Sequence, residues 1–162
     1  MVSTTQTELP ILQRGAQGSA VVKLQKLIVR FFGDLGYEED RLQVDGIFGA
    51  ITEGAVKEIQ ERFFLVVNGT VGAKTWNALM ARENAELPVL RQGSNHKELV
   101  RRVQQRLAFN NYYPLTVDGS FGFRMEHYVQ QFQTDHHLVA DGVIGRNTWK
   151  ALSYLYPYGR FV

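Results

Sequence analysis

An internal repeat limits the folds open to this chain more than any other feature of its sequence. Residues 44–49 (VDGIFG) recur as residues 117–122 (VDGSFG), and Thr75-Trp76 recurs as Thr148-Trp149, both at an offset of 73 residues. Farther upstream, the motif V-x-x-L-Q at residues 21–25 matches V-x-x-V-Q at residues 100–104 at an offset of 79. Two similar units therefore follow each other, and the first carries six extra residues ahead of its Asp-Gly loop.

Apolar residues recur within each unit at helical spacing. Val21, Leu24, Ile28 and Phe31 lie on one face of a predicted first helix, as do Val100, Val103 and Leu107 in the second unit. Val56, Ile59 and Phe63 predict a second helix in the first unit, as Val129 and Phe132 do in the second unit. A short third helix is predicted at residues 75–79 and 148–152, with a Thr at or near its cap. The sequence thus predicts an all-α protein made of two tandem three-helix bundles.

The repeat boundaries divide the chain into four segments. We expect repeats at residues 10–80 and 88–153, a linker at 81–87 and an aromatic tail at 154–162. A bundle of about 70 residues buries only a small core, so we expect the two units to pack on each other.

Composition excludes several classes of protein. The 162 residues include no cysteine, which excludes disulfides and thiolate metal sites. The net charge of +2 is too small to indicate nucleic-acid binding. No apolar run is long enough to span a membrane, and the first residues show no export signal.

The motifs resemble one known family. Each unit is similar to the peptidoglycan-binding domain type 1 family, whose pattern combines D-G-x-F-G, F-Q, D-G and T-W-x-x-L. The matching motif positions are Asp45, Gly46, Phe48, Gly49, Gln60 and Trp76 in the first unit, and Asp118, Gly119, Phe121, Gly122, Gln133, Asp141, Gly142 and Trp149 in the second. Met125 departs from the pattern, because it stands where the family has a Thr that caps the second helix.

The resemblance implies a module that binds peptidoglycan or muropeptides in the cell envelope or outside the cell, beside a cell-wall enzyme. Since two modules fill the chain, we expect that it anchors or targets without catalysis, with a separate cell-wall enzyme as a partner. Two alternatives stay open: an intracellular protein-protein interaction module that reuses the fold, and a small cell-wall hydrolase.

No set of residues in the sequence is typical of catalysis. The histidines lack the His-Glu-x-x-His spacing of zinc hydrolases, and a Gly-x-Ser-x-Gly elbow is absent. Glu53, Glu58, Glu61 and the acidic run 38–40 lie among polar neighbours, so we expect them on a solvated face rather than in a muramidase cleft. We therefore expect no enzyme, no metal and no cofactor.

Two groups of residues are candidates for ligand contact, whereas the tryptophans and two glutamines of the motifs are not. Trp76, Trp149, Gln60 and Gln133 are better explained by burial, with each Gln holding a backbone turn. Arg146 and Asn147, at the start of the third helix of the second unit, could instead receive a muropeptide carboxylate.

Aromatic residues outside the bundle pattern form the other group, namely Tyr112, Tyr113 and the tail residues Tyr154, Tyr156, Tyr158 and Phe161. For the tail, packing across the two units is the favoured interpretation.

Overall fold

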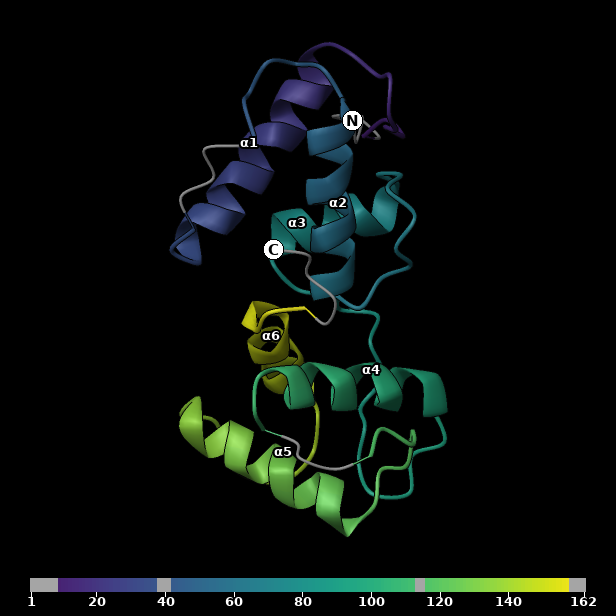
Figure 1. Cartoon of the computed structure of the whole chain (residues 1–162), viewed down its shortest axis with the longest axis vertical. Helices are drawn as coiled ribbons and strands as arrows, with labels where there is room; N and C mark the ends of the chain where they lie inside the picture. Colours follow the sequence, from purple (N-terminus) through teal and green to yellow (C-terminus); the bar gives the residue numbers. More distant parts are fainter. Residues whose placement is uncertain (1–8, 38–41, 113–115, 158–162) are drawn as a thin grey trace, which may run out of the picture.

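The computed structural model describes residues 9–37, 42–112 and 116–157. Within these ranges it has six helices and no strand: α1 (Ser19–Asp34), α2 (Ala50–Arg62), α3 (Ala73–Ala81), α4 (Lys97–Phe109), α5 (Phe123–Asp135) and α6 (Arg146–Tyr154). Figure 1 shows α1–α3 gathered in one half of the molecule and α4–α6 in the other. The prediction of an all-α fold with two tandem three-helix units is confirmed.

The predicted apolar stripes form two cores. Val21, Leu24 and Ile28 of α1 are fully buried, as are Val100, Val103 and Leu107 at the matching positions of α4. Short antiparallel bridges, such as the one that joins Leu12 to Val71, tie the entry turn of each unit to the loop before its third helix. Each core is therefore built mainly from its own repeat, with Phe64 of the first unit buried in the second core.

Glycines start four of the helices. Gly49, Gly72, Gly122 and Gly145 are the N-caps of α2, α3, α5 and α6, with extended backbone and no side-chain cap. The predicted Thr75 lies near the start of α3 but does not cap it. Its hydroxyl instead accepts a hydrogen bond from Gln60 Nε2 at 3.3 Å, in the buried interior. Met125, at the family's Thr position in α5, is buried in the second core.

Buried glutamines hold the Asp-Gly and Asn-Gly loops against the helices. Gln25 Oε1 accepts from the amide of Gly46 at 2.9 Å, and its Nε2 donates to Asp45 Oδ1 at 2.8 Å. Gly46 has φ +74, so the turn requires a residue without a side chain. The same arrangement recurs at Gln60, Gln104 and Gln133, which accept from the amides of Gly69, Gly119 and Gly142. The turn-holding role predicted for Gln60 and Gln133 is confirmed, and the sequence analysis missed it for the other two.

The tryptophans are core residues, as predicted. Trp76 and Trp149 are 1% and 4% exposed. Each donates its indole N–H to the backbone oxygen of a proline in the entry turn, Pro10 or Pro88, at 2.8 Å. Because both the ring and its N–H are satisfied inside the protein, neither indole is available to stack on a sugar.

Arg106 of α4 joins the two units. Its side chain is fully buried and donates to the carbonyl of Glu61 at 2.7 Å and to that of Leu152 at 3.1 Å. Burial lowers its pKa to about 10, so it keeps its charge at neutral pH. The guanidinium also lies over the ring of Phe64, 4.6 Å from the centroid. A residue of the second unit thereby binds the C-terminal end of α2 in the first.

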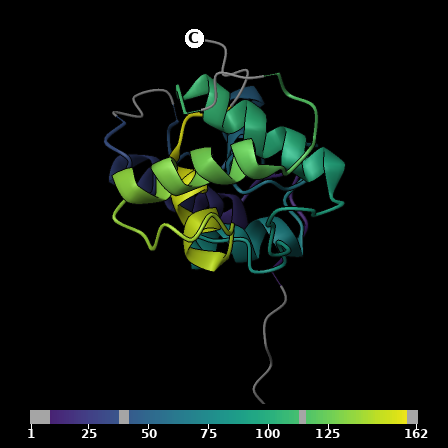
Figure 2. The ribbon, with the colours of Figure 1, turned by 90° about the horizontal axis from the view of Figure 1, so that it is seen from below.

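Arg62 makes the reciprocal connection from α2. It is also fully buried, and its Nη1 donates to the carbonyls of Tyr154 and Leu155 at 3.4 and 3.1 Å. These carbonyls end α6, where a helix leaves acceptors unpaired and carries partial negative charge. A cation from one unit therefore satisfies the last turn of a helix in the other, and the expected packing of the two units is confirmed. Figure 2 views the molecule from the second unit, with α5 nearest the viewer.

The described part of the aromatic tail packs across the units. The ring of Tyr154 stacks on Phe31 of α1 with centroids 6.1 Å apart, and Tyr156 meets Tyr37 edge-on at 5.8 Å. The favoured interpretation of the tail is confirmed for these two residues. Tyr158 and Phe161 lie outside the described residues.

Candidate functional site

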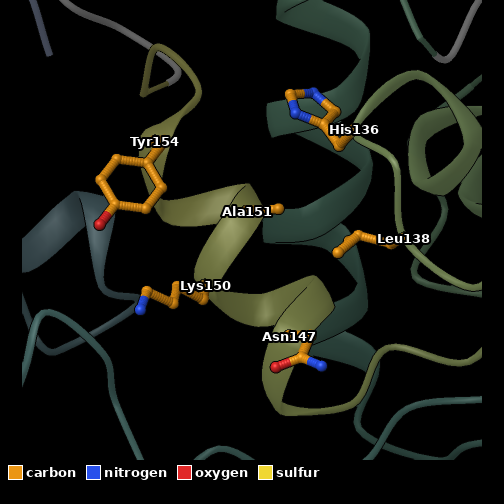
Figure 3. Close-up of a pocket in the computed structure, with 6 residues that line it drawn as sticks. All are labelled: His136, Leu138, Asn147, Lys150, Ala151 and Tyr154. Atoms are coloured by element: carbon orange, nitrogen blue, oxygen red, sulfur yellow. The ribbon is translucent and has the colours of Figure 1, made fainter.

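An open hollow lies on the outer face of α6. Its volume is about 270 Å³, and six residues line it: His136, Leu138, Asn147, Lys150, Ala151 and Tyr154. Figure 3 shows Leu138, which follows α5, with its side chain directed toward Ala151 on α6. Four of the residues come from α6 at the spacing i, i+3, i+4 and i+7, which places them on one helix face. The opposite face carries Trp149 and Leu152 into the core.

Polar groups of three kinds surround this hollow. Asn147 lies in the first turn of α6 and brings an amide. Lys150 brings a cation, which acts together with Arg146 to lower the pKa of Glu83. Tyr154 brings a phenol ring, already stacked on Phe31. The hollow therefore combines an apolar floor, an amide, an ammonium group and an aromatic edge.

His136 is the one partly buried histidine among the described residues. Its ring packs on Phe132 at 4.3 Å, and its Nε2 is buried without a hydrogen-bond partner. Burial lowers the pKa of this imidazole, which favours the neutral ring at pH 7. The expectation of surface or partly buried histidines holds for the other three as well, since His96, His127 and His137 are exposed.

Two residues that line the hollow have more deeply buried counterparts in the first unit. Phe63, the counterpart of His136, is buried and packs on Phe31 at a centroid distance of 5.3 Å. Ala78, the counterpart of Ala151, is 2% exposed, whereas Ala151 is only half-buried. The aromatic end of α1 therefore helps to fill in the first unit the space that is open in the second.

The guanidinium of Arg146 already binds a carboxylate of the protein itself. Its Nε donates to Glu83 Oε2 at 2.8 Å, and its Nη2 donates to the other carboxylate oxygen. This pair lowers the pKa of Glu83 and raises that of Arg146. The predicted carboxylate dock at Arg146 and Asn147 stays a prediction, and in this structure Arg146 binds a carboxylate of the linker. Asn147 does lie in the hollow, beside a lysine that the sequence analysis did not select.

Tyr112 serves the second core. Its ring meets Phe132 edge-on at 5.3 Å and lies 6.1 Å from His136. Burial raises the pKa of its phenol. A ligand contact by Tyr112 stays a prediction, and Tyr113 lies outside the described residues.

Several acidic residues are engaged in ion pairs. Glu53 bonds Lys57 at 2.7 Å, and Glu61 bonds Arg102 of α4 at 3.1 Å. Glu61 therefore belongs to the junction of the two units and not to the solvated face expected for it. Glu38, Glu39 and Asp40 lie outside the described residues.

The described ranges contain neither a cluster of metal-ligating side chains nor a helix suited to span a membrane. No three acidic, histidine or cysteine side chains there come together as a metal site would need. None of the described helices combines the length and apolarity required to cross a bilayer.

Comparison with known proteins identifies the family. A family model described as a peptidoglycan binding domain matches residues 17–79 and 96–152, once in each unit. The chain belongs to the peptidoglycan-binding domain family. This agrees with the repeat motifs and with the two helical units, and makes peptidoglycan the partner that the family description names.

Curated relatives carry the names of cell-wall enzymes. The N-acetylmuramoyl-L-alanine amidase CwlL of Bacillus licheniformis is 30% identical over 90% of this chain and 46% of its own length. CwlM of Mycobacterium tuberculosis, also named an amidase, is 28% identical over 89% of this chain and 37% of its own length. A spore cortex-lytic enzyme of Bacillus cereus is 39% identical over 43% of this chain and 25% of its own length. This chain thus spans less than half the length of each of these relatives.

These names contradict one sequence-based prediction. We expected a protein that is not an enzyme, whereas relatives about 30% identical over 90% of the chain are named amidases, so this prediction does not stand. The prediction rested only on the absence of catalytic motifs inside the two repeats. The names of the relatives describe whole proteins, of which this chain spans less than half.

Proposed function

We propose that this protein takes part in cell-wall hydrolysis of the amidase type, and that its two units bind peptidoglycan to hold that activity on its substrate. The family match in both units supports the binding, and the names of the relatives support the hydrolysis. In this proposal residues 10–80 and 88–153 are the two binding units, and residues 81–87 connect them.

The observation that carries the proposal is the hollow on α6. Peptidoglycan offers sugar rings, peptide amides and free carboxylates. The Tyr154 ring edge and the apolar floor suit a sugar or an alanine methyl group, the Asn147 amide suits a peptide group, and Lys150 suits a carboxylate. The three groups lie on one face of one helix, so a single wall fragment can meet all of them.

The junction of the two units adds to the effect. Arg62 and Arg106 hold the units together through buried hydrogen bonds, so their outer surfaces keep a constant separation. Peptidoglycan is a polymer, so a second contact on the same strand forms at high effective concentration once the first is made. Weak single contacts then give firm retention on the wall.

Co-sedimentation with insoluble peptidoglycan sacculi tests the binding. We expect the full chain to pellet saturably, and Lys150→Glu to weaken retention about tenfold, because it replaces an attraction for carboxylates by a repulsion. Lys97→Glu is the matched control, since it makes the same charge change at an exposed position of α4 and should pellet like the wild type. Equal retention of the two variants would reject the hollow as the site.

The hydrolytic half of the proposal needs a separate readout. Cleavage of an amide bond in the wall releases an amine, so we expect new free amino groups in sacculi incubated with the protein, counted against a heat-denatured sample. Retention without any rise in amino groups would reject the hydrolysis and leave the binding intact.

A further inference from the structure

A second open groove lies along α1 in the first unit. Its volume is about 410 Å³, and its lining comes entirely from α1: Ser19, Val22, Lys23, Lys26, Leu27 and Arg30. Half-buried Val22 and Leu27 supply an apolar floor, and the three cations are exposed. Figure 1 shows α1 at the outer edge of the first unit.

The cations form a row along the helix. Lys23, Lys26 and Arg30 follow each other at intervals of three and four residues, which places them on one face. At 1.5 Å per residue, the row extends over about 10 Å of the helix axis. No acidic group in the described ranges pairs with any of the three, in contrast to Arg14 and Lys57 of the same unit, which both bind Glu53.

The matching face in the second unit already binds a carboxylate. At the repeat offset of 79 residues, Arg102 of α4 corresponds to Lys23 and Arg106 corresponds to Leu27. Arg102 and Arg106 approach the two carboxylate oxygens of Glu61 at 3.1 and 3.5 Å. Lys26 and Arg30 correspond to Gln105 and Phe109, so the carboxylate bound on α4 is a precedent for the position of Lys23 in particular.

We propose that the α1 groove binds the free carboxylates of peptidoglycan stem peptides. The inference rests on the proposed function, which makes the wall the partner, and it adds a second contact of defined chemistry. Charge complementarity selects the occupant, because three cations in a row attract a peptide with several carboxylates. Val22 and Leu27 accept its small aliphatic side chains. Neutral sugar strands carry no negative charge that the three cations would attract.

The test compares sacculi before and after amidation of their carboxylates. The groove variant carries Lys23→Gln, Lys26→Gln and Arg30→Gln, substitutions that keep helix propensity and remove three charges. The control carries Arg91→Gln, Lys97→Gln and Arg124→Gln, which removes three exposed charges from the second unit. Circular dichroism and thermal unfolding verify that both variants are folded.

On untreated sacculi at low salt, we expect the groove variant to bind about tenfold more weakly than the wild type, and the control variant to bind like the wild type. On amidated sacculi the groove variant and the wild type should bind equally. Added salt should weaken the wild type more than the groove variant, since screening acts on exposed charges.

Each other outcome overturns the inference in its own way. If the groove variant and the wild type bind untreated sacculi equally, the groove is not a wall contact, although the hollow on α6 keeps its role. If the difference survives amidation and disappears only when phosphate-containing polymers are stripped from the wall, the ligand is a phosphate. If the wild type does not pellet at all, the proposed function fails together with the groove.

Discussion

Replacing Arg106 by alanine should separate the two units. The side chain is buried, and its guanidinium donates to the carbonyl oxygens of Glu61, Arg62 and Leu152. It also lies 3.5 Å from a carboxylate oxygen of Glu61. The carbonyls of Glu61 and Leu152 also accept from the backbone amides of Phe64 and Leu155, at 3.1 and 3.2 Å. The substitution therefore removes the charged donor that links the two units and leaves those backbone bonds in place.

The magnitude follows from these contacts. The bonds of 2.7 and 3.1 Å are well formed and the one of 3.4 Å is weak, and a hydrogen bond to a charged group contributes about 1.5–3 kcal/mol. Removal of one member of a buried charged cluster costs about 3–5 kcal/mol. Glu61 keeps Arg102 as a partner, which limits the loss. We therefore expect the free energy of unfolding to fall by about 3–4 kcal/mol.

Urea unfolding followed by fluorine NMR measures this loss. Each unit contains one tryptophan, Trp76 or Trp149, so fluorinated tryptophan gives one signal for each unit. We expect the two native signals of the wild type to disappear together. In Arg106→Ala the midpoints should shift to lower urea and move apart, because the units no longer stabilise each other.

Arg102→Ala is the matched control. It removes an arginine one turn away whose side chain is 21% exposed and which pairs with the same Glu61, so its loss should stay below about 1 kcal/mol. The reasoning is refuted if Arg106→Ala costs no more than Arg102→Ala, or if both signals of Arg106→Ala still disappear at one urea concentration.

Two further substitutions test the second unit. Gln133→Leu should lower the free energy of unfolding by about 2 kcal/mol, because the buried amide of Gly142 loses its acceptor; Gln131→Leu, on the exposed face of α5, should change it little, and equal effects in thermal unfolding would reject the role of Gln133. His136→Phe places the residue of the first unit in the second and should raise stability at pH 7 by about 1 kcal/mol, since it removes a buried nitrogen without a partner. Burial lowers the pKa of His136, so this imidazole is protonated at a higher pH in the unfolded chain than in the folded protein. The free energy of unfolding therefore falls as the pH drops below the ordinary pKa of 6.5. Urea unfolding from pH 7.5 to 5 should show a smaller fall in His136→Phe than in the wild type, and equal slopes would contradict the assignment.

Much of each unit could be predicted because its signals are local. Apolar residues at helical spacing identified α1 and α4, and the repeated Asp-Gly steps marked the turns that Gln25 and Gln104 hold. The burial of Trp76 was predictable from its phase with Leu79 on one short helix. These contacts join residues of the same repeat, so the same sequence pattern predicts them in both units.

The candidate site was predicted only in part. Asn147 was selected for its place at a helix start, and it lines the hollow. Tyr154 was selected as an aromatic residue outside the bundle pattern, and it lines the hollow as well. Lys150 shares the helix face of Asn147 and could have been found from the i, i+3 spacing alone. His136 could not, because it comes from the end of another helix. Nor does any spacing pair Arg146 with Glu83, which lies 63 residues away in the linker.

By itself, the sequence determined two helical bundles, their core residues and the turns between their helices, because these depend on periodicity and on contacts within a repeat. Only the tertiary structure decided that Arg62 and Arg106 are buried. In a helical pattern an arginine on the polar side indicates a solvated face. Both are buried because they meet carbonyls at the ends of helices in the other unit, up to 93 residues away, and these charge-assisted hydrogen bonds offset the cost of removing the two guanidinium groups from water.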